Sequence, residues 1–481
     1  MTDTMREYPF FVGGEWRENP DPVMVRSPYD GRPVGLVHQA RERDMEDATV
    51  AAAVSFAELR TLSSARRSAV LASMADRIEE RSEELAAMLV LEAGKTRLNA
   101  AAEVRRGALT LRISAEEARR IGGELIDLDW TEETEGRIGI LRRFPIGPVL
   151  GITPFNFPLN IACHKIGPAL AAGNPVILKP ASATPVSALL LAEIAEASGI
   201  PDGALSVLPC PGSRAEVLVK DDRIAALNFT GSADVGWHLR EMTGRKKVIL
   251  ELGGNAAVIV HHDCPDLDYA ATRIVAGGFA NAGQVCISVQ RVLVHEDIYE
   301  EMRGMILARV RNLRTGDPDS DQTDVGPLID DAAAKRAEEL VQSAVRDGAS
   351  PLCGGERRGR ILSPAVVTGT SPGMRIEHEE AFAPLITVNP YQSFSEALAR
   401  ANTSTYGLQL GVFTSDINRV MTAFAESRVG GVVINDIPGF RADHMPYGGV
   451  KGSGTGKEGP RYAIREMTEE KLLVITRMKG A

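Results

Sequence analysis

Cys286 and its neighbours form the segment most suited to covalent chemistry. The segment reads Asn281-Ala-Gly-Gln-Val-Cys-Ile-Ser, with polar residues and a glycine in an otherwise apolar run. Gly283 permits close backbone approach, and we expect a loop-to-helix junction whose N–H groups support a nucleophilic thiolate. The alternative is a small buried side chain with no chemical role, because cysteine is among the most buried residue types.

Glu251 is a carboxylate in an unusual position. It follows the apolar run Val248-Ile-Leu and precedes Gly253 and Gly254, so it ends a predicted buried strand. A carboxylate there is unfavourable unless it is paired or used in a reaction. A salt bridge is one interpretation. The other is a cleft with an apolar wall, where the carboxylate has a raised pKa and acts as a general base on water.

Three further segments could bind a ligand. In Phe229-Thr-Gly-Ser, Gly231 allows a tight turn, and the helix expected after Ser232 could hold a pyrophosphate at its N-terminus. Lys179 follows the apolar run 176–178 and places a cation at the carboxyl edge of the same sheet, where ligands bind. Asn156 lies between aromatic residues and prolines and could donate its amide to an oxyanion. An ordinary strand-to-helix loop and a turn-capping asparagine are the alternatives.

The elements that must position these residues alternate between strands and helices. Apolar residues every three or four positions predict helices over residues 63–93 and 98–121. Residues 123–144 predict a long hairpin that leaves the core, and residues 471–477 predict the last strand. Short continuous apolar runs predict buried strands at residues 149–152, 175–178, 204–208, 224–229 and 247–252, with helices at 185–197 and 214–219. This alternation indicates an α/β fold with a parallel sheet covered on both faces.

A second α/β segment is predicted from residue 256 to about residue 449. Its strands are expected near residues 257–260, 292–294, 365–367, 386–388 and 432–434. A chain of 481 residues is too long for one ordinary core, so we expect two or three domains.

Composition excludes several classes of protein. The net charge of −10 is spread along the chain, which disfavours nucleic acid and anionic membranes as partners. Residues 1–7 lack the apolar core of a secretory signal, and no stretch of about 18 uninterrupted apolar residues predicts a membrane span. The five cysteines include no CxxC pair, so neither a disulfide framework nor a metal site is expected, and the cytoplasm is the predicted location.

Seven motifs taken together resemble the aldehyde dehydrogenase superfamily, and the resemblance covers nearly the whole chain. They are Pro154-Phe-Asn-Phe-Pro, Lys179-Pro, Phe229-Thr-Gly-Ser, Glu251-Leu-Gly-Gly, Gly283-Gln-Val-Cys, Glu379-Glu-Ala-Phe-Ala-Pro and Tyr447-Gly-Gly-Val-Lys. The resemblance implies NAD(P)-dependent oxidation of an aldehyde to a carboxylic acid through a cysteine thiohemiacetal and thioester.

The resemblance also implies a role for each matching residue. Cys286 is the implied nucleophile, Glu251 the base for the deacylating water, and Asn156 an oxyanion donor. Lys179 would hold a cofactor ribose hydroxyl, Ser232 would lie beside the pyrophosphate, and Glu380 would bind the nicotinamide ribose. The full cofactor set that we expect is Thr153, Pro154, Lys179, Ser182, Gly231, Ser232, Glu380 and Phe382.

By resemblance the fold has three parts. Residues 1–122 and 145–252 would form a Rossmann-variant cofactor domain, and residues 253–452 a catalytic α/β domain. Residues 123–144 and 465–481 would form a bridging β element that pairs with a partner subunit, giving a homodimer or homotetramer. Two rivals remain: a coenzyme A-acylating relative, which often lacks the base present here as Glu251, and a non-catalytic protein of the same fold.

Positions at which this chain departs from the family pattern affect the expected cofactor preference and the expected substrate class. Many NAD-preferring relatives carry glutamate where this chain has Ser182, so NADP use is expected beside NAD. The chain is similar to lactaldehyde, phosphonoacetaldehyde and succinic semialdehyde dehydrogenases. It has His164 and Ala280 at the arginine clamp of the last group, and Val285 where phosphonoacetaldehyde enzymes place arginine. Arg106, His164 and Arg441 are expected at the substrate entrance, which favours a small polar or anionic aldehyde.

Overall fold

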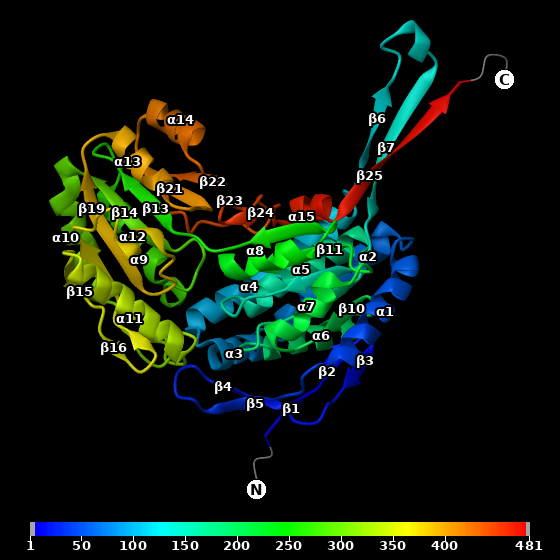
Figure 1. Ribbon diagram of the computed structural model, residues 1–481, viewed down its shortest axis with the longest axis horizontal. Coiled ribbons are helices and arrows are strands. Elements are labelled where there is room, and N and C mark those ends of the chain that lie inside the picture. Colours follow the sequence, from blue (N-terminus) through cyan, green and yellow to red (C-terminus); the bar gives the residue numbers. More distant parts are fainter. Residues whose placement is uncertain (1–4, 478–481) are drawn as a thin grey trace.

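The computed structural model describes residues 5–477 as two α/β units with a projecting ribbon (Figure 1). Two of the sequence predictions reach beyond this range. Residues 1–4 of the expected non-signal N-terminus and residues 478–481 of the expected bridging element lie outside the described residues. Within residues 5–477, no helix is both long and apolar enough to cross a membrane.

The first unit is built on an eight-stranded sheet in the order β24-β12-β11-β8-β9-β10-β2-β3. Its strands are β2 (Phe10–Val12), β3 (Glu15–Arg17), β8 (Val149–Ile152), β9 (Val176–Lys179), β10 (Leu205–Val207), β11 (Ala226–Thr230), β12 (Lys247–Glu251) and β24 (Gly454–Thr455). The five strands from β8 to β12 are parallel, as predicted. The expectation of a wholly parallel sheet is wrong at both edges, where β2 pairs antiparallel with β10, and β24 antiparallel with β12.

Two groups of helices pack on this sheet. Helices α5 (Pro158–Ala172) and α6 (Val186–Ala197) contact its strands and pack against helices nearer the N-terminus: α2 (Ser64–Glu80), α3 (Ser82–Ala93) and α4 (Arg97–Ala118). The second group is α1 (Glu42–Leu59), α7 (Gly212–Lys220) and α8 (Ala233–Met242). The single helix predicted over 63–93 is broken at Arg81, whose guanidinium pairs with Glu84 and Glu193 at 2.7 and 2.8 Å.

The second unit is built on a seven-stranded sheet in the order β15-β18-β19-β14-β13-β21-β22. Its strands are β13 (Ala256–Val260), β14 (Val289–His295), β15 (Ser350–Cys353), β18 (Ala365–Thr368), β19 (Leu385–Tyr391), β21 (Gln409–Phe413) and β22 (Gly431–Ile434). Its helices are α9 (Leu267–Phe279), α10 (Tyr299–Val310), α11 (Asp331–Arg346), α12 (Arg375–His378), α13 (Phe394–Asn402) and α14 (Ile417–Glu426). All pairs are parallel except that of β15 with β18, and the five predicted strands are confirmed within a few residues.

The chain returns to the first unit near its end. Helix α15 (Pro460–Glu466) packs on α5, and Ala463, Ile464 and Met467 join the same hydrophobic core as the first sheet. The smaller elements are β1 (Glu7–Tyr8), β4 (Val23–Arg26), β5 (Pro33–Val37), β16 (Arg357–Arg358), β17 (Ile361–Leu362), β20 (Tyr406–Gly407), β23 (Val450–Lys451) and the 3-10 turns η1 (Glu132–Thr134), η2 (Ala280–Gly283) and η3 (Glu296–Ile298).

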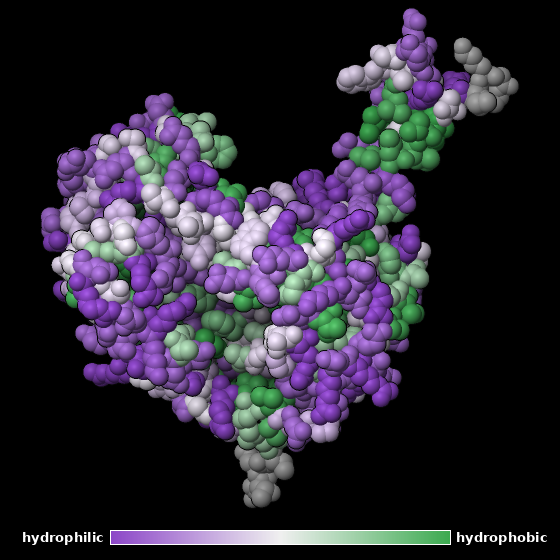
Figure 2. All heavy atoms as spheres, in the orientation of Figure 1, coloured by the Kyte–Doolittle hydropathy of each residue, from purple (hydrophilic) through white to green (hydrophobic). Residues whose placement is uncertain are grey.

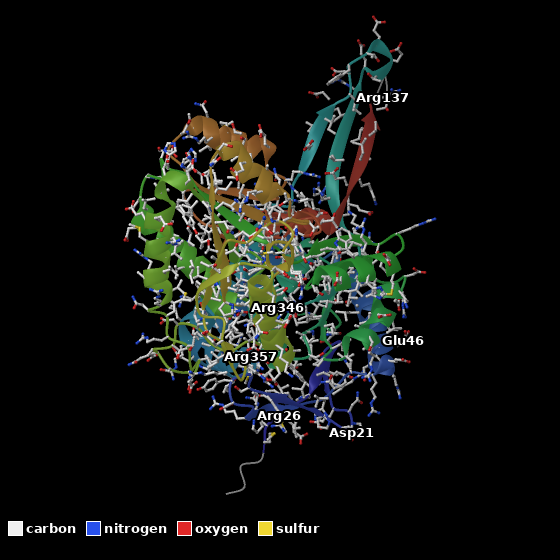
Figure 3. All side chains as sticks on the ribbon, turned by 60° about the vertical axis from the view of Figure 1, so that its left-hand side comes forward. Asp21, Arg26, Glu46, Arg137, Arg346 and Arg357 are labelled. Atoms are coloured by element: carbon white, nitrogen blue, oxygen red, sulfur yellow. The ribbon has the colours of Figure 1, made fainter. Side chains whose placement is uncertain are left out.

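A three-stranded antiparallel ribbon projects from the body, as the predicted hairpin and last strand require (Figure 1). It consists of β6 (Gly123–Asp127), β7 (Arg137–Pro145) and β25 (Thr468–Thr476), with β7 in the middle. Its apolar side chains are exposed, including Leu125 and the run 472–475, and they appear as a green patch in Figure 2. Charged side chains are spread over the whole molecule, with Arg137 on the ribbon and Glu46 and Arg346 on the body (Figure 3).

Candidate active site

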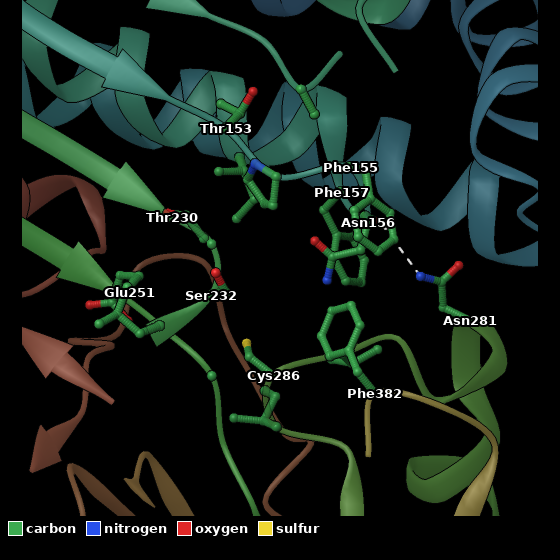
Figure 4. Close-up of a pocket in the computed structure, with 18 of the residues that line it drawn as sticks. Thr153, Phe155, Asn156, Phe157, Thr230, Ser232, Glu251, Asn281, Cys286 and Phe382 are labelled. Atoms are coloured by element: carbon green, nitrogen blue, oxygen red, sulfur yellow. Dashed lines mark hydrogen bonds between the residues drawn. The ribbon is translucent and has the colours of Figure 1, made fainter. Parts of the chain in front are cut away.

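A cavity of about 1140 Å³ lies between the two units, with walls from both. Every residue that the sequence placed in a catalytic, cofactor or substrate role lines this cavity, with the exception of His164. The residues reach it from the carboxyl ends of β8, β9, β11 and β12, from α4, and from the loops before β14, before β19 and after β22. In Figure 4 the sulfur of Cys286 lies between Glu251 and Asn156. The topology of the parallel sheet therefore gathers residues that are far apart in the sequence.

Cys286 is held in a tight turn rather than at the start of a helix. The preceding turn η2 has positive φ at Asn281 (50°), Ala282 (54°) and Gly283 (69°). A Cβ on Gly283 would lie 2.0 Å from the carbonyl oxygen of Ala383, so this glycine is required for close approach. The expected loop-to-helix junction is wrong, because the apolar residues after Ser288 continue as β14.

The Cys286 thiol is partly buried and lies beside a phenol. Its Sγ lies 2.9 Å from Oη of Tyr447. Burial raises the pKa of Cys286 to about 12, and the hydrogen bond with Tyr447 and the nearby Arg441 charge oppose that rise. A phenol O–H directed at the sulfur stabilises the thiolate more than the thiol, because hydrogen bonds to a charged acceptor are the stronger ones.

The Asn156 side chain is tied to the same turn. It follows β8 and is 7% exposed, and its Nδ2 donates to the backbone oxygen of Gln284 at 2.8 Å. Asn281 Nδ2 in turn donates to the backbone oxygen of Asn156 at 3.4 Å, the bond drawn in Figure 4. An amide nitrogen has two N–H donors, so one remains for a substrate oxygen beside Cys286.

Glu251 ends β12 and is 2% exposed. Neither carboxylate oxygen has a hydrogen-bond partner, and no ion pair of Glu251 is present among residues 5–477. Burial, followed by the neighbouring charge of Glu458, raises the pKa of Glu251 well above its usual value. The geometry therefore disfavours the salt-bridge interpretation and supplies the conditions that a general base requires.

The proposed cofactor residues line one side of the cavity. Ser232 caps the N-terminus of α8 without using its side chain, and Thr153 Oγ1 is buried without a partner. Lys179 ends β9, where burial lowers its pKa, and Ser182 donates to the backbone oxygen of Cys210 at 3.2 Å. Free N–H groups at a helix N-terminus, a lysine and an unpartnered hydroxyl are the groups that a dinucleotide needs.

Glu380 and Phe382 face this region from the second unit. Glu380 accepts the backbone N–H of Gly254 at 2.9 Å, and burial raises its pKa to about 7. A Cβ on Gly253 would lie 2.4 Å from a Glu380 oxygen, which explains the glycine. Phe382 packs edge-on against Phe155 with ring centroids 5.8 Å apart.

The three predicted substrate residues are placed differently from one another. Arg106 lines the cavity as expected, and its Nη2 and Nε donate to Asp443 at 2.8 and 3.1 Å. Arg441 also lines the cavity, and its Nη2 donates to Glu458 at 2.9 Å and lies 3.3 Å from Nε2 of His164. The placement of His164 in the wall is wrong. Its side chain is fully buried behind the wall, where Nε2 lies 3.1 Å from Asp443 Oδ1.

Comparison with models of known protein families identifies the family of this chain. The model described as the aldehyde dehydrogenase family matches residues 16–473. The chain belongs to the aldehyde dehydrogenase family. The resemblance inferred from the seven motifs is thus confirmed, and with it the assignment of the chain as an oxidoreductase that acts on aldehydes.

Three relatives of this aldehyde dehydrogenase are informative. The chain is 43% identical over 472 residues to 3-sulfolactaldehyde dehydrogenase from Priestia aryabhattai, covering 98% of each chain. Aldehyde dehydrogenase 21 from Physcomitrella patens, solved with the reaction product succinate, matches with TM-score 0.98 and 40% identity over 99% of this chain and 100% of that one. Glyceraldehyde-3-phosphate dehydrogenase from Methanocaldococcus jannaschii, complexed with NADP, matches with TM-score 0.91 and 35% identity over 96% and 100%. These matches confirm the predicted fold class.

The structure of this aldehyde dehydrogenase adds cavity residues to which the sequence gave no role. Tyr447 was recognised only as part of a glycine motif, and its contact with Cys286 joins positions far apart in the chain. Asn160 also lines the cavity, and its Nδ2 is buried without a partner. Helical spacing could have indicated Asn160, because it lies one turn before His164 on α5.

Proposed function

We propose that the chain oxidises an aldehyde to a carboxylate through a thioester on Cys286, with NAD or NADP as the hydride acceptor. The observation that supports this most directly is the convergence of Cys286, Asn156 and unpaired Glu251 on one cavity. The Cys286 thiolate adds to the carbonyl carbon, and the resulting oxyanion accepts hydrogen bonds from the amide of Asn156. A nicotinamide cofactor held by Lys179, Ser232 and Glu380 would supply the hydride acceptor that formation of the thioester on Cys286 requires.

The second half of the reaction is proposed to depend on Glu251. Its carboxylate takes a proton from water, and the hydroxide oxygen bonds to the thioester carbon while the carbon–sulfur bond breaks. The products are the carboxylate and the regenerated Cys286 thiolate. A buried carboxylate with no partner retains its lone pairs for this proton, which the absence of an ion pair at Glu251 among residues 5–477 makes possible.

The cofactor residues support a dinucleotide along Lys179, Ser232 and Glu380, and we propose NADP at least as readily as NAD. Ser182 lines the cavity without a negative charge, so it does not repel a 2′-phosphate. Lys179 and Ser232 belong to the first unit and Cys286 belongs to the second. We therefore propose residues 1–122 and 145–252 as the cofactor domain and residues 253–452 as the catalytic domain.

We propose a small polar or anionic aldehyde as the substrate. Arg106 bonds Asp443 through Nε and Nη2, and Arg441 bonds Glu458 through Nη2, so each Nη1 group retains donors for a substrate oxygen. The unpartnered Nδ2 of Asn160 adds another donor. A hydrocarbon substrate would leave these donors unpaired, which is unfavourable by about 1–3 kcal/mol for each buried group.

A substrate panel tests this proposal. We expect higher kcat/KM for 3-sulfolactaldehyde, lactaldehyde and glyceraldehyde than for hexanal and benzaldehyde. Arg106→Lys should raise KM for the polar substrates and leave hexanal unaffected, whereas Arg105→Lys, on the exposed side of the same helix, should change neither. A tenfold preference for hexanal would refute the polar site while leaving the reaction class intact.

We further propose that the chain forms a homodimer or homotetramer through the ribbon of β6, β7 and β25. Leu472, Leu473, Val474 and Ile475 of β25 are 46–56% exposed, and such a run of apolar side chains is typical of a protein interface. Sedimentation of the purified protein would test the assembly.

All five cysteines are free, which suits the proposed cytoplasmic location.

A further inference from the structure

Three histidines gather at the end of the second sheet that lies away from Cys286. His261 follows β13, His295 ends β14, and His262 lies beside His261. One ring nitrogen of each lies within 4.8 Å of those of the other two, and the ring centroids are 4.4–4.8 Å apart. Val260 and Val294 are paired in register on parallel strands, so the next residue of each strand must meet its neighbour.

We propose that His261, His262 and His295 form a binding site for a zinc ion, with water as the fourth ligand. Neutral imidazole is a preferred zinc ligand, and three histidines with an open position make a standard coordination set. Around a tetrahedral zinc ion the ligand nitrogens lie about 3.3 Å apart, as follows from Zn–N bonds of about 2.0–2.1 Å. The three nitrogens must therefore approach each other by about 1.5 Å at most.

The arrangement of burial suits this movement. His261 and His295 are 4% and 8% exposed and are fixed in the sheet, whereas His262 is exposed. The exposed member can turn towards the two fixed rings, and its side provides the entry path that a metal ion needs.

Hydrogen bonds behind the cluster orient the two buried rings. Tyr391 Oη donates to the backbone oxygen of Val260 (3.3 Å), so its oxygen can accept Nδ1–H of His261 at 2.7 Å. That arrangement leaves the lone pair of His261 on Nε2. Nδ1 of His295 accepts the backbone N–H of Asp297 at 3.3 Å, and metal binding through Nε2 would move the imidazole proton to Nδ1, where the Asp297 carboxylate 3.4 Å away can accept it. A carboxylate or polar oxygen behind a histidine is the usual support of a metal ligand.

The positive charge of Arg419 near the proposed zinc site is largely neutralised by two carboxylates. Arg419 is close enough to disfavour a cation, but its charge is paired with Asp263 at 2.8 Å and Asp416 at 3.4 Å.

The site would serve stability rather than the reaction. His295 lies at the far end of β14 from Cys286, about 20 Å along a strand of this length. A metal there joins the carboxyl ends of β13 and β14, two neighbouring strands of the second sheet. Zinc binding should therefore raise Tm, because a ligand that binds the folded state alone stabilises it.

Cobalt substitution tests the site in the full-length Cys286→Ser protein, which lacks the reactive thiol. We expect one Co²⁺ per chain with the visible d–d bands of a tetrahedral nitrogen and oxygen site. His262→Asn should weaken Co²⁺ binding on the order of tenfold or more. His378→Asn, a matched change at an exposed histidine of α12, should leave it unchanged. Because His262 is exposed, its substitution leaves the core intact.

Thermal unfolding provides the second measurement. Zn²⁺ should raise Tm of the parent and of His378→Asn, and should not raise Tm of His262→Asn. Equal Co²⁺ affinity in His262→Asn and its parent would overturn the proposal. So would a thiolate-to-metal charge-transfer band, which would place the ion on a cysteine, or the absence of Co²⁺ binding.

Discussion

Tyr447→Phe isolates the hydrogen bond that the phenol makes to the Cys286 sulfur. Among residues 5–477 the structure gives Tyr447 Oη no other hydrogen-bond partner, so phenylalanine removes one interaction and preserves the ring beneath Arg441. A hydrogen bond to a charged group contributes about 1.5–3 kcal/mol, and about 1.4 kcal/mol corresponds to one pKa unit. The variant should therefore raise the pKa of Cys286 by about one to two units above its already elevated value.

The effect on reactivity is smaller than the shift in pKa. Raising the pKa lowers the thiolate fraction about 10- to 100-fold, but a more basic thiolate is also more nucleophilic, with a Brønsted coefficient of about 0.4–0.5. The net loss in the rate of iodoacetamide alkylation at fixed pH below the pKa is about three- to tenfold. Tyr299→Phe removes a 2.6 Å contact with Thr368 outside the cavity and should not alter that rate.

Alkylation is followed by the mass of the Cys286 peptide over time, at several pH values. The three- to tenfold slowing should appear across the whole range below the pKa, with an unchanged far-ultraviolet spectrum. If Tyr447→Phe reacts as fast as the parent protein, or faster, the phenol does not support the thiolate and the proposed activation of Cys286 is incorrect.

Three further results are expected. Ser182→Glu should shift preference from NADP towards NAD by about 1–3 kcal/mol, because the new carboxylate repels a 2′-phosphate, and an unchanged ratio of the two kcat/KM values would place that recognition elsewhere. Thioester hydrolysis in single turnovers should become faster as pH rises through the raised pKa of Glu251, since only the ionised carboxylate accepts a proton, whereas a flat profile would exclude it as the base. Cys163→Ala should retain dehydrogenase activity and Cys286→Ala should lose it without losing cofactor binding, as measured by steady-state assay and cofactor titration.

The central strands and the general fold class could be predicted from local sequence alone. Continuous apolar runs such as 149–152 mark buried parallel strands, and these were correctly placed. The antiparallel edge strands β2 and β24 have three and two residues, and they are held by pairing with distant segments. No local pattern indicates such pairing. The break at Arg81 likewise involves Glu193, far along the chain.

The site residues could be predicted where the residue type itself indicates the chemistry. They could not be predicted where the role depends on whether the side chain reaches the cavity. Cys286 and Glu251 combine reactive groups with turn glycines, so their sequence context indicates a role. His164 lies one turn beyond Asn160 on α5 and both side chains are 1% exposed, but only Asn160 lines the cavity. Sequence spacing gives direction around a helix and does not give distance from the surface. The pairing of Arg441 with Glu458 likewise depends on the tertiary arrangement.

The most direct test of the central claim is the intact mass of Glu251→Gln after mixing with NADP and an excess of aldehyde. Without the base, acylation should proceed once and hydrolysis should stall, with a loss on the order of 10²–10⁴ in the deacylation rate. Removal of a buried, unpaired carboxylate should not lower Tm, so the variant should fold. We predict one acyl group per chain, found on the Cys286 peptide, with one equivalent of NADPH released. Full steady-state turnover without an adduct, or an acyl group on another cysteine, would contradict the mechanism.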